Sequence, residues 1–174
     1  LSNRVTITNA ILVQSPNGPS FTSIVGGGTN LSSTSVRCVY LSAGGQLSGF
    51  ALTNGNAGSL GTTASQYGGG VFVEGGATLS NCLITGCGSF VGGAGVCLQS
   101  NGWVRNCVIA SNRSSTGGGG VLMINVNAGG VEASVIRGNT AGGVYVNGAG
   151  LLSGCLVVSN FSTGVGSGYY CVNG

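Results

Sequence analysis

Short segments in which apolar and polar residues alternate recur along the chain. Five of them begin repeating units and occupy residues 38–41, 70–73, 95–98, 120–123 and 143–146. Each is followed by a turn rich in Gly, Asn and Ser and by a second apolar segment, at residues 47–52, 79–84, 104–109, 131–136 and 152–157. Alternation with a period of two is typical of β-strands, and no apolar pattern has helical spacing. The sequence therefore predicts an all-β protein.

The repeating unit has a nearly constant length. From Val71 to Val96, Val121 and Val144 the intervals are 25, 25 and 23 residues, which is the period of a solenoid. Such a period accommodates three short strands and three turns, and coils stack at the roughly 4.8 Å spacing of neighbouring strands. We expect a parallel β-helix of about six to seven coils of roughly 21–27 residues, with three short parallel sheets. We expect residues 1–35 to form lead-in strands or a first coil, and residues 36–174 to form the regular coils of one continuous domain.

Equivalent residues of stacked coils lie above one another, so the repeats predict columns. Two columns fill the core: Val71, Val96, Val121 and Val144, and Ile84, Ile109, Ile136 and Val157. A third core column contains Cys82, Cys107 and Cys155, with Ser134 and Phe50 in the remaining coils. In a fourth column, formed by Asn112, Asn139 and Asn160, stacked amides are expected to hydrogen-bond to one another, and Cys87 takes that place in an earlier coil.

The chain carries little charge. Its 174 residues contain five arginines, two glutamates and no lysine, histidine or aspartate. The arginines are scattered from Arg4 to Arg137, so we expect no nucleic-acid partner. Because histidine and Cys-x-x-Cys spacing are absent, we expect no metal site, and nothing indicates a cofactor. Because no run of about 18 apolar residues exists, we expect no insertion into a membrane.

Several phrases carry a family resemblance. They are residues 17–19 (Asn-Gly-Pro), 23–26, 36–41 and 47–55, together with the recurring Gly-Gly-Gly-Val and Asn-Cys-x-Ile motifs. The chain resembles right-handed parallel β-helix repeat proteins related to the repeats of chlamydial polymorphic outer-membrane proteins. The resemblance implies a right-handed parallel β-helix, display on a bacterial cell surface or secretion, and a role in adhesion. Aspartates, which often occupy turns in such families, are absent here, which argues against calcium-bound coils.

Some β-helices cleave polysaccharides, which requires paired carboxylates or a base beside an acidic cluster. Here Glu74 follows the first strand of its unit and Glu132 lies in the second strand of another, so the repeat places them on different sheets. Glu132 aligns one coil above Arg105, which predicts a salt bridge on an outward position. We therefore expect no catalytic residues.

Two features predict contacts with partners. If the valines of the first strand point inward, the alternate positions form an outward apolar stripe: Tyr40, Phe72, Cys97, Leu122 and Tyr145. This stripe is predicted to be a contact surface, unless residues 1–35 fold back over it. The terminal strands show no evident cap, so subunits are expected to stack head to tail through Val5, Ile7, Tyr169, Tyr170 and Val172.

The seven cysteines leave the pairing open. Cys82 and Cys87 are placed to bridge across a turn, and Cys38 or Cys171 to bond a neighbouring chain. Seven cysteines in a chain rich in Ser, Thr, Asn and Gly also indicate an exported protein.

The sequence thus predicts a non-enzymatic, extracellular or cell-surface β-solenoid with a structural or adhesive role. Its partners are expected to be other copies of itself, stacked head to tail in a filament, or the adjoining coils of a longer surface fibre. The alternative is an adhesin module that binds carbohydrate or a host surface through outward tyrosines, and a polysaccharide lyase or hydrolase is a third reading that the absence of Asp, His and Lys opposes.

Overall fold

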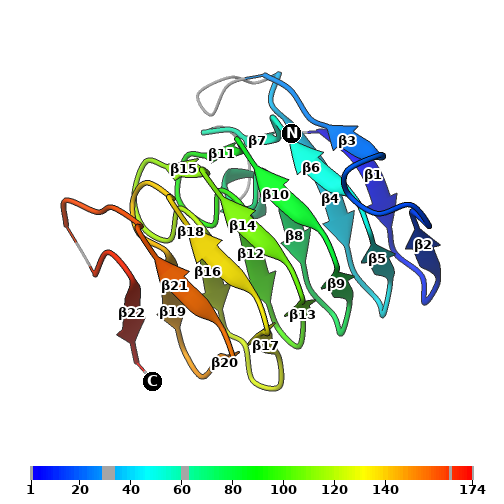
Figure 1. The fold of residues 1–174 in the computed structure, drawn as a ribbon. Helices are drawn as coiled ribbons and strands as arrows, with labels where there is room; N and C mark the ends of the chain where they lie inside the picture. The colour runs from blue at the N-terminus through cyan, green and yellow to red at the C-terminus, as the bar shows by residue number, and fades with distance from the viewer. Residues whose placement is uncertain (1, 29–33, 60–62, 165, 174) are drawn as a thin grey trace.

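A computed structural model of the chain describes residues 2–28, 34–59, 63–164 and 166–173 (Figure 1). These residues form an all-β structure of parallel sheets, which fits a β-solenoid. Besides strands they form one short 3₁₀ helix, η1 (Thr63–Gln66). No helix in this part of the chain is long and apolar enough to cross a membrane. The all-β architecture predicted from the repeats is confirmed.

Four parallel sheets run along the stack of coils. Sheet A contains β1 (Ser2–Ile7), β4 (Val36–Leu41), β8 (Val71–Val73), β12 (Val96–Gln99), β16 (Val121–Ile124), β19 (Val144–Asn147) and β22 (Tyr169–Val172). Sheet B contains β2 (Leu12–Gln14), β5 (Gln46–Ser48), β9 (Thr78–Ser80), β13 (Trp103–Arg105), β17 (Gly130–Glu132) and β20 (Leu151–Ser153). Sheet C contains β3 (Ser23–Val25), β6 (Ala51–Thr53), β10 (Leu83–Thr85), β14 (Val108–Ala110), β18 (Val135–Arg137) and β21 (Leu156–Val158).

Sheet D is short and was not predicted. It contains β7 (Asn56–Ala57), β11 (Gly88–Ser89) and β15 (Arg113–Ser114), each of which follows a strand of sheet C. The chain extends for two residues here because three successive coils make the same turn and their backbones come into register. The prediction of three sheets is therefore wrong by one.

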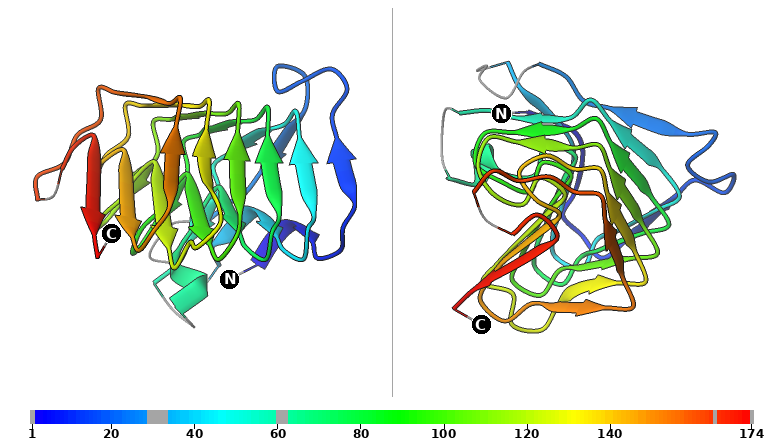
Figure 2. Two further views of the ribbon diagram at one scale, coloured as in Figure 1. Left: turned by 90° about the horizontal axis from the view of Figure 1, so that it is seen from below. Right: turned by 60° about the vertical axis from the view of Figure 1, so that its left-hand side comes forward.

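The strand register aligns the repeats as predicted. In sheet A, Val71 pairs with Val96, Val96 with Val121 and Val121 with Val144. The predicted isoleucine column lies in register in sheet C, and its three isoleucines are fully buried. Strands succeed one another along the stack (Figure 2). The inward side chains form one hydrophobic core cluster. Both predicted core columns are confirmed.

The first two coils are longer than predicted. Strand pairing sets Val5 beside Val39 and Val39 beside Val71, which are 34 and 32 residues apart. Most of the extra length of the first coil lies in the loop between β2 and β3, and that of the second coil lies in the segment between β7 and β8, which contains η1. Strands β1, β2 and β3 pair with β4, β5 and β6, so the N-terminal segment forms a coil of the same stack.

The same corner geometry recurs between sheets B and C in successive coils. The residue before the inward position has a positive φ in five coils, at Gly49, Asn81, Asn106, Ala133 and Gly154. Gly and Asn adopt this left-handed conformation more readily than other residues. The sharp corner turns the next side chain inward, which explains why Asn-Cys recurs and why Cys82 and Cys107 are buried.

An asparagine ladder holds the coils together on the side of sheet C. Asn112 Nδ2 donates to Asn139 Oδ1 at 3.1 Å and to the Ile84 carbonyl at 3.1 Å. One coil further, Asn139 Nδ2 donates to Asn160 Oδ1 at 2.9 Å. At the N-terminal end of the ladder, the backbone N–H of Cys87 donates to Asn112 Oδ1 at 3.0 Å. The predicted ladder is confirmed, and each amide bonds to two neighbouring coils.

Candidate ligand-binding groove

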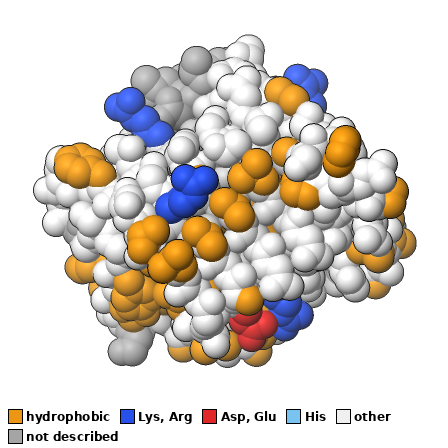
Figure 3. Space-filling model, viewed as in Figure 1, with side chains coloured by type: hydrophobic (Ala, Val, Ile, Leu, Met, Phe, Trp, Pro, Cys, Tyr) orange, Lys and Arg blue, Asp and Glu red, His pale blue; other side chains and the backbone are white. Residues whose placement is uncertain are grey.

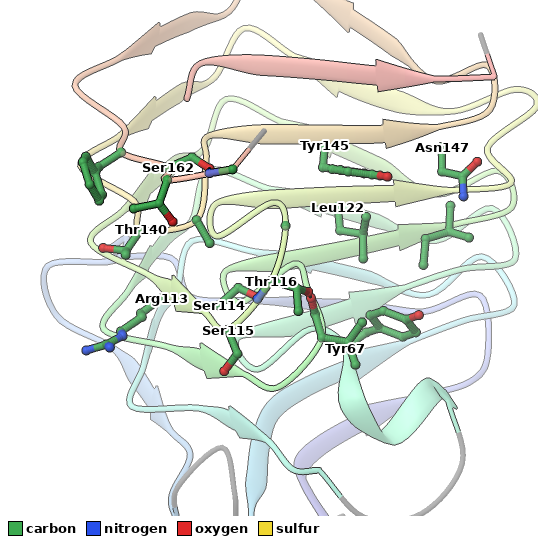
Figure 4. A pocket seen from close by; sticks show the side chains of 17 residues that line it. Tyr67, Arg113, Ser114, Ser115, Thr116, Leu122, Thr140, Tyr145, Asn147 and Ser162 are labelled. Atoms are coloured by element: carbon green, nitrogen blue, oxygen red, sulfur yellow. Dashed lines mark hydrogen bonds between the residues drawn. The ribbon is translucent and has the colours of Figure 1, made fainter. Parts of the chain in front are cut away.

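A groove of about 1150 Å³ lies on the outer face of sheet A (Figure 4). Its strand wall is formed by outward side chains of β16 and β19: Leu122, Ile124, Tyr145 and Asn147. Its loop wall is formed by residues 113–117, 140–141 and 161–164, and Tyr67 and Val91 contribute at one end. The groove therefore runs along the stack and crosses several coils.

The repeat fixes both walls. On the strand wall, Leu122 pairs with Tyr145, and the residues on either side of them in the strands face the core. On the loop wall, Arg113, Thr140 and Phe161 are bridged in parallel one coil after another. Because both walls follow the coil spacing, successive positions along the groove are about 4.8 Å apart.

The lining combines flat apolar rings with small polar groups. Tyr67, Tyr145 and Phe161 supply the rings, and Phe161 is 60% exposed. Hydroxyl and amide groups come from Ser114, Ser115, Thr116, Thr140, Ser162, Thr163 and Asn147. Arg113 is the one charged residue of the lining, which contains no carboxylate. An open cleft of this composition suits an uncharged or anionic ligand rich in hydroxyl groups.

The predicted outward stripe faces away from the core, but most of it is covered. Phe72, Cys97 and Leu122 form a separate buried cluster, with exposed fractions of 1%, 0% and 6%. Tyr40 and Tyr145 pack at its edges and are half-buried. The prediction of an exposed stripe is therefore wrong for these three buried residues. Of the stripe, only the two residues nearest the C-terminus, Leu122 and Tyr145, line the groove.

The stripe is covered by the segment around Tyr67 and by glycine-rich loops, whereas the sequence suggested residues 1–35. Tyr67 packs against the buried cluster. The glycines lie so close to the stripe that a side chain at Gly92 or Gly117 would overlap Leu122 or Tyr145. The runs of glycine thus allow each loop to lie over the next outward side chain.

Arg37 holds this cover in place, a role that the sequence did not reveal. Its guanidinium donates to the carbonyl oxygens of Gly68 (2.8 Å), Ala64 (2.7 Å) and Tyr67 (2.8 Å), and it lies 5.1 Å from the centre of the Phe72 ring. Burial lowers the pKa of Arg37 from 12.5 to about 10, so it remains charged at neutral pH. The one available signal was an arginine within an otherwise apolar strand.

Both carboxylates of the chain lie outside the groove. Glu132 accepts a hydrogen bond from Arg105 Nε at 2.8 Å, which confirms the predicted salt bridge, and Arg105 also lies 4.3 Å from the Trp103 ring centre. Glu74 accepts a hydrogen bond from the Tyr40 hydroxyl. Glu132 lies in β17 of sheet B, whereas Glu74 directly follows β8 of sheet A, so the two glutamates are at different sheets of the coil, as predicted.

The cysteines form the predicted core column and not the bridge across a turn that the sequence left open. The column of Cys82, Cys107 and Cys155 is present, with the first two buried and the third half-buried. Cys82 contacts Cys107, and Cys87 contacts Cys38, so Cys82 and Cys87 do not bridge the turn. Thiol contact and burial raise the pKa of Cys87 and of Cys107.

Cysteine accessibility also corrects the predicted contacts with other chains. Cys38 is buried, so the prediction that it bonds a neighbouring chain is wrong, whereas Cys171 is exposed. Where the structure describes the chain, no three His, Cys, Asp or Glu residues cluster as metal ligands would.

The residues predicted to contact other subunits lie on the two terminal strands of sheet A. Val5 and Val172 are half-buried and Ile7 is buried, whereas Tyr169 and Tyr170 are exposed. Contact between subunits through these strands stays a prediction.

A further outward apolar surface, on sheet C, was missed; Leu156 in it is exposed, and its other residues are half-buried. The outward positions next to the buried isoleucine column are Leu83, Val108, Val135 and Leu156, which lie in register. Apolar side chains gather over these strands in the face shown in Figure 3. The recurring apolar residue after each Asn-Cys was the signal, since alternation along the strand directs it outward.

Compared with models of known protein families, with curated proteins and with solved structures, the chain has no significant match. The resemblance to the chlamydial repeats is therefore supported only as far as the fold, through the parallel all-β architecture.

Proposed function

We propose that this protein is a non-enzymatic adhesive β-solenoid, exposed outside the cell, that binds a carbohydrate chain in the groove on sheet A. The groove carries the proposal because it is long, open and lined by aromatic rings and hydroxyl groups. Aromatic faces pack against the apolar faces of sugar rings, while hydroxyl and amide groups hydrogen-bond to sugar hydroxyls. Extended surfaces of this kind are characteristic of solenoids.

The rest of the chain supports a scaffold that presents this groove. The ladder and the core columns tie neighbouring coils into a stiff support for both walls. We further propose that the coils wind in the right-handed sense of the chlamydial repeats, since connections between parallel strands are right-handed in nearly all proteins. A non-enzymatic role is supported by the composition of the groove, whose lining includes neither Glu74 nor Glu132.

Removing the exposed ring of the loop wall should weaken carbohydrate binding. We expect Phe161→Ala to lower the affinity for oligosaccharides about tenfold, because about 1.4 kcal/mol of ring contact is lost. Isothermal titration against a panel of neutral and charged oligosaccharides would measure it. Phe21→Ala is the matched control, because Phe21 is 81% exposed and does not line the groove. Equal losses in both variants, or no binding of any oligosaccharide by the parent protein, would contradict the proposal.

A second candidate function is assembly of coils end to end. Inward positions that are fully buried in the middle of the stack are only half-buried in the first and last coils, at Val13, Ile24, Leu152 and Val157. A second copy stacked on either coil would cover these positions and extend the parallel sheets. The partner proposed here is another copy of the chain.

End-to-end assembly predicts a concentration-dependent mass. We expect sedimentation experiments to show oligomers that grow with protein concentration. Val157→Lys should abolish them because it places a charge at the inward end of the core, while Val158→Lys, at the neighbouring outward position, should leave them intact. A monomer at all concentrations would exclude this function, as would equal assembly of the two variants.

A further inference from the structure

We propose that the groove selects an anionic carbohydrate, carrying carboxylate or sulfate groups, and that Arg113 recognises the negative charge. This inference rests on the proposed function, because it specifies the ligand of the same groove. It concerns the charge of the ligand, which the aromatic and hydroxyl groups of the lining do not determine.

The charges of the chain point to this ligand. Arg113 is exposed and is the one charged residue lining the groove. The chain has two carboxylate side chains, and Glu132 pairs with Arg105 while Glu74 accepts a hydrogen bond from Tyr40. Neither therefore neutralises Arg113. A guanidinium in a cleft without carboxylates favours an anion, since its planar group can donate two parallel hydrogen bonds to a carboxylate or sulfate.

The backbone around Arg113 is held firmly. Its N–H donates to the Cys87 carbonyl at 2.9 Å, and the next N–H, that of Ser114, donates to the Thr140 carbonyl at 3.3 Å. Arg113 thus belongs to sheet D, where it pairs with Gly88 on one side and bridges Thr140 on the other. A fixed backbone lowers the entropy lost when the side chain engages a ligand.

The spacing along the loop wall indicates the size of the ligand. Arg113, Thr140 and Phe161 lie in successive coils, so the backbones that carry the charge and the exposed ring are about 10 Å apart along the stack. This exceeds the length of one sugar ring. A short oligosaccharide can therefore place an anionic group at Arg113 and a ring face at Phe161, with Thr140 between them.

The test compares a trisaccharide that carries carboxylates with its uncharged ester and with a sulfated trisaccharide. Titration calorimetry would use trigalacturonate, its uncharged methyl ester and a sulfated trisaccharide. We expect the parent protein to bind at least one of the charged trisaccharides about tenfold more tightly than the ester, and the two charged probes distinguish carboxylate from sulfate as the recognised group. Arg113→Gln should remove the preference without changing the affinity for the ester. Arg137→Gln is the matched control, because Arg137 is also exposed but lies on sheet C.

The outcomes separate the two proposals. Binding of the ester as tightly as both charged trisaccharides would overturn the inference and leave carbohydrate binding in place. A charge preference that persists in Arg113→Gln, or that is lost equally in Arg137→Gln, would overturn the role of Arg113. Failure of all three trisaccharides and of the wider oligosaccharide panel would overturn the proposed function itself. Circular dichroism of each variant would confirm that the β-fold is retained.

Discussion

Replacing Asn139 with alanine is expected to lower the free energy of unfolding by about 4 kcal/mol. Asn139 Oδ1 accepts from the Asn112 backbone N–H at 2.9 Å, and Asn139 Nδ2 donates to the Ile109 carbonyl at 3.0 Å. The side chain is 1% exposed, so water cannot reach these groups without opening the coil. Each buried group left without a partner costs about 1–3 kcal/mol, and the lost side-chain volume adds a cavity. Since a domain of this kind is stable by about 5–15 kcal/mol, the loss is severe.

Urea denaturation followed by circular dichroism would measure this loss. Asn101→Ala is the matched control, because Asn101 lies in an exposed turn, and we expect it to change stability by less than about 0.5 kcal/mol. Similar small losses in both variants would show that the ladder contributes little to stability.

Replacing Gly120 with alanine is expected to destabilise the protein by about 3 kcal/mol. A Cβ atom built at Gly120 would lie 2.5 Å from the Gly143 carbonyl oxygen, 2.8 Å from Ile136 Cγ2 and 2.9 Å from Asn139 Nδ2. The conflict is one of space, because Gly120 packs where the ladder meets the isoleucine column. Overpacking of this kind costs about 1–3 kcal/mol, and here the nearest atom is backbone of the next coil, which cannot rotate away.

The same repeat position in the last coil provides the control. Gly168 precedes Tyr169 as Gly120 precedes Val121, but a Cβ atom at Gly168 would meet nothing within 4 Å. Gly168→Ala should therefore leave the melting temperature nearly unchanged, whereas Gly120→Ala should lower it by several degrees. If the two alanine variants melt together, crowding at the ladder does not explain the glycine of the Gly-Val motif.

The features that repeat in every coil were predictable. The regular spacing of the first-strand valines predicts that they form a column: Val71, Val96, Val121 and Val144. Parallel stacking of the coils then requires the register that is observed. The ladder followed from the same reasoning, because amides at one position of successive coils must meet. Periodicity in the sequence and periodicity in space are here the same property.

The features that occur once were not predictable. The alternating pattern correctly predicted that Phe72 and Cys97 point outward from the core. Nothing in the sequence indicated that the segment around Tyr67 would cover them. That cover depends on three hydrogen bonds from Arg37 to residues 64–68, which are about 30 positions away in the chain. The groove begins where this cover ends, so its position also escaped prediction, although Tyr145 and Leu122 were identified as outward residues.

The long segment between β7 and β8 shows how such a scaffold can change without losing its fold. By Tyr67, which bridges Gly92 in parallel, it pairs with the next coil again, and the strands on either side keep the common register. Insertions at this corner therefore cost little folding free energy, and they alter what lies over the outer face of sheet A. During evolution, insertions and deletions at the same corner of any coil could reshape the groove. The ladder and the core would be retained.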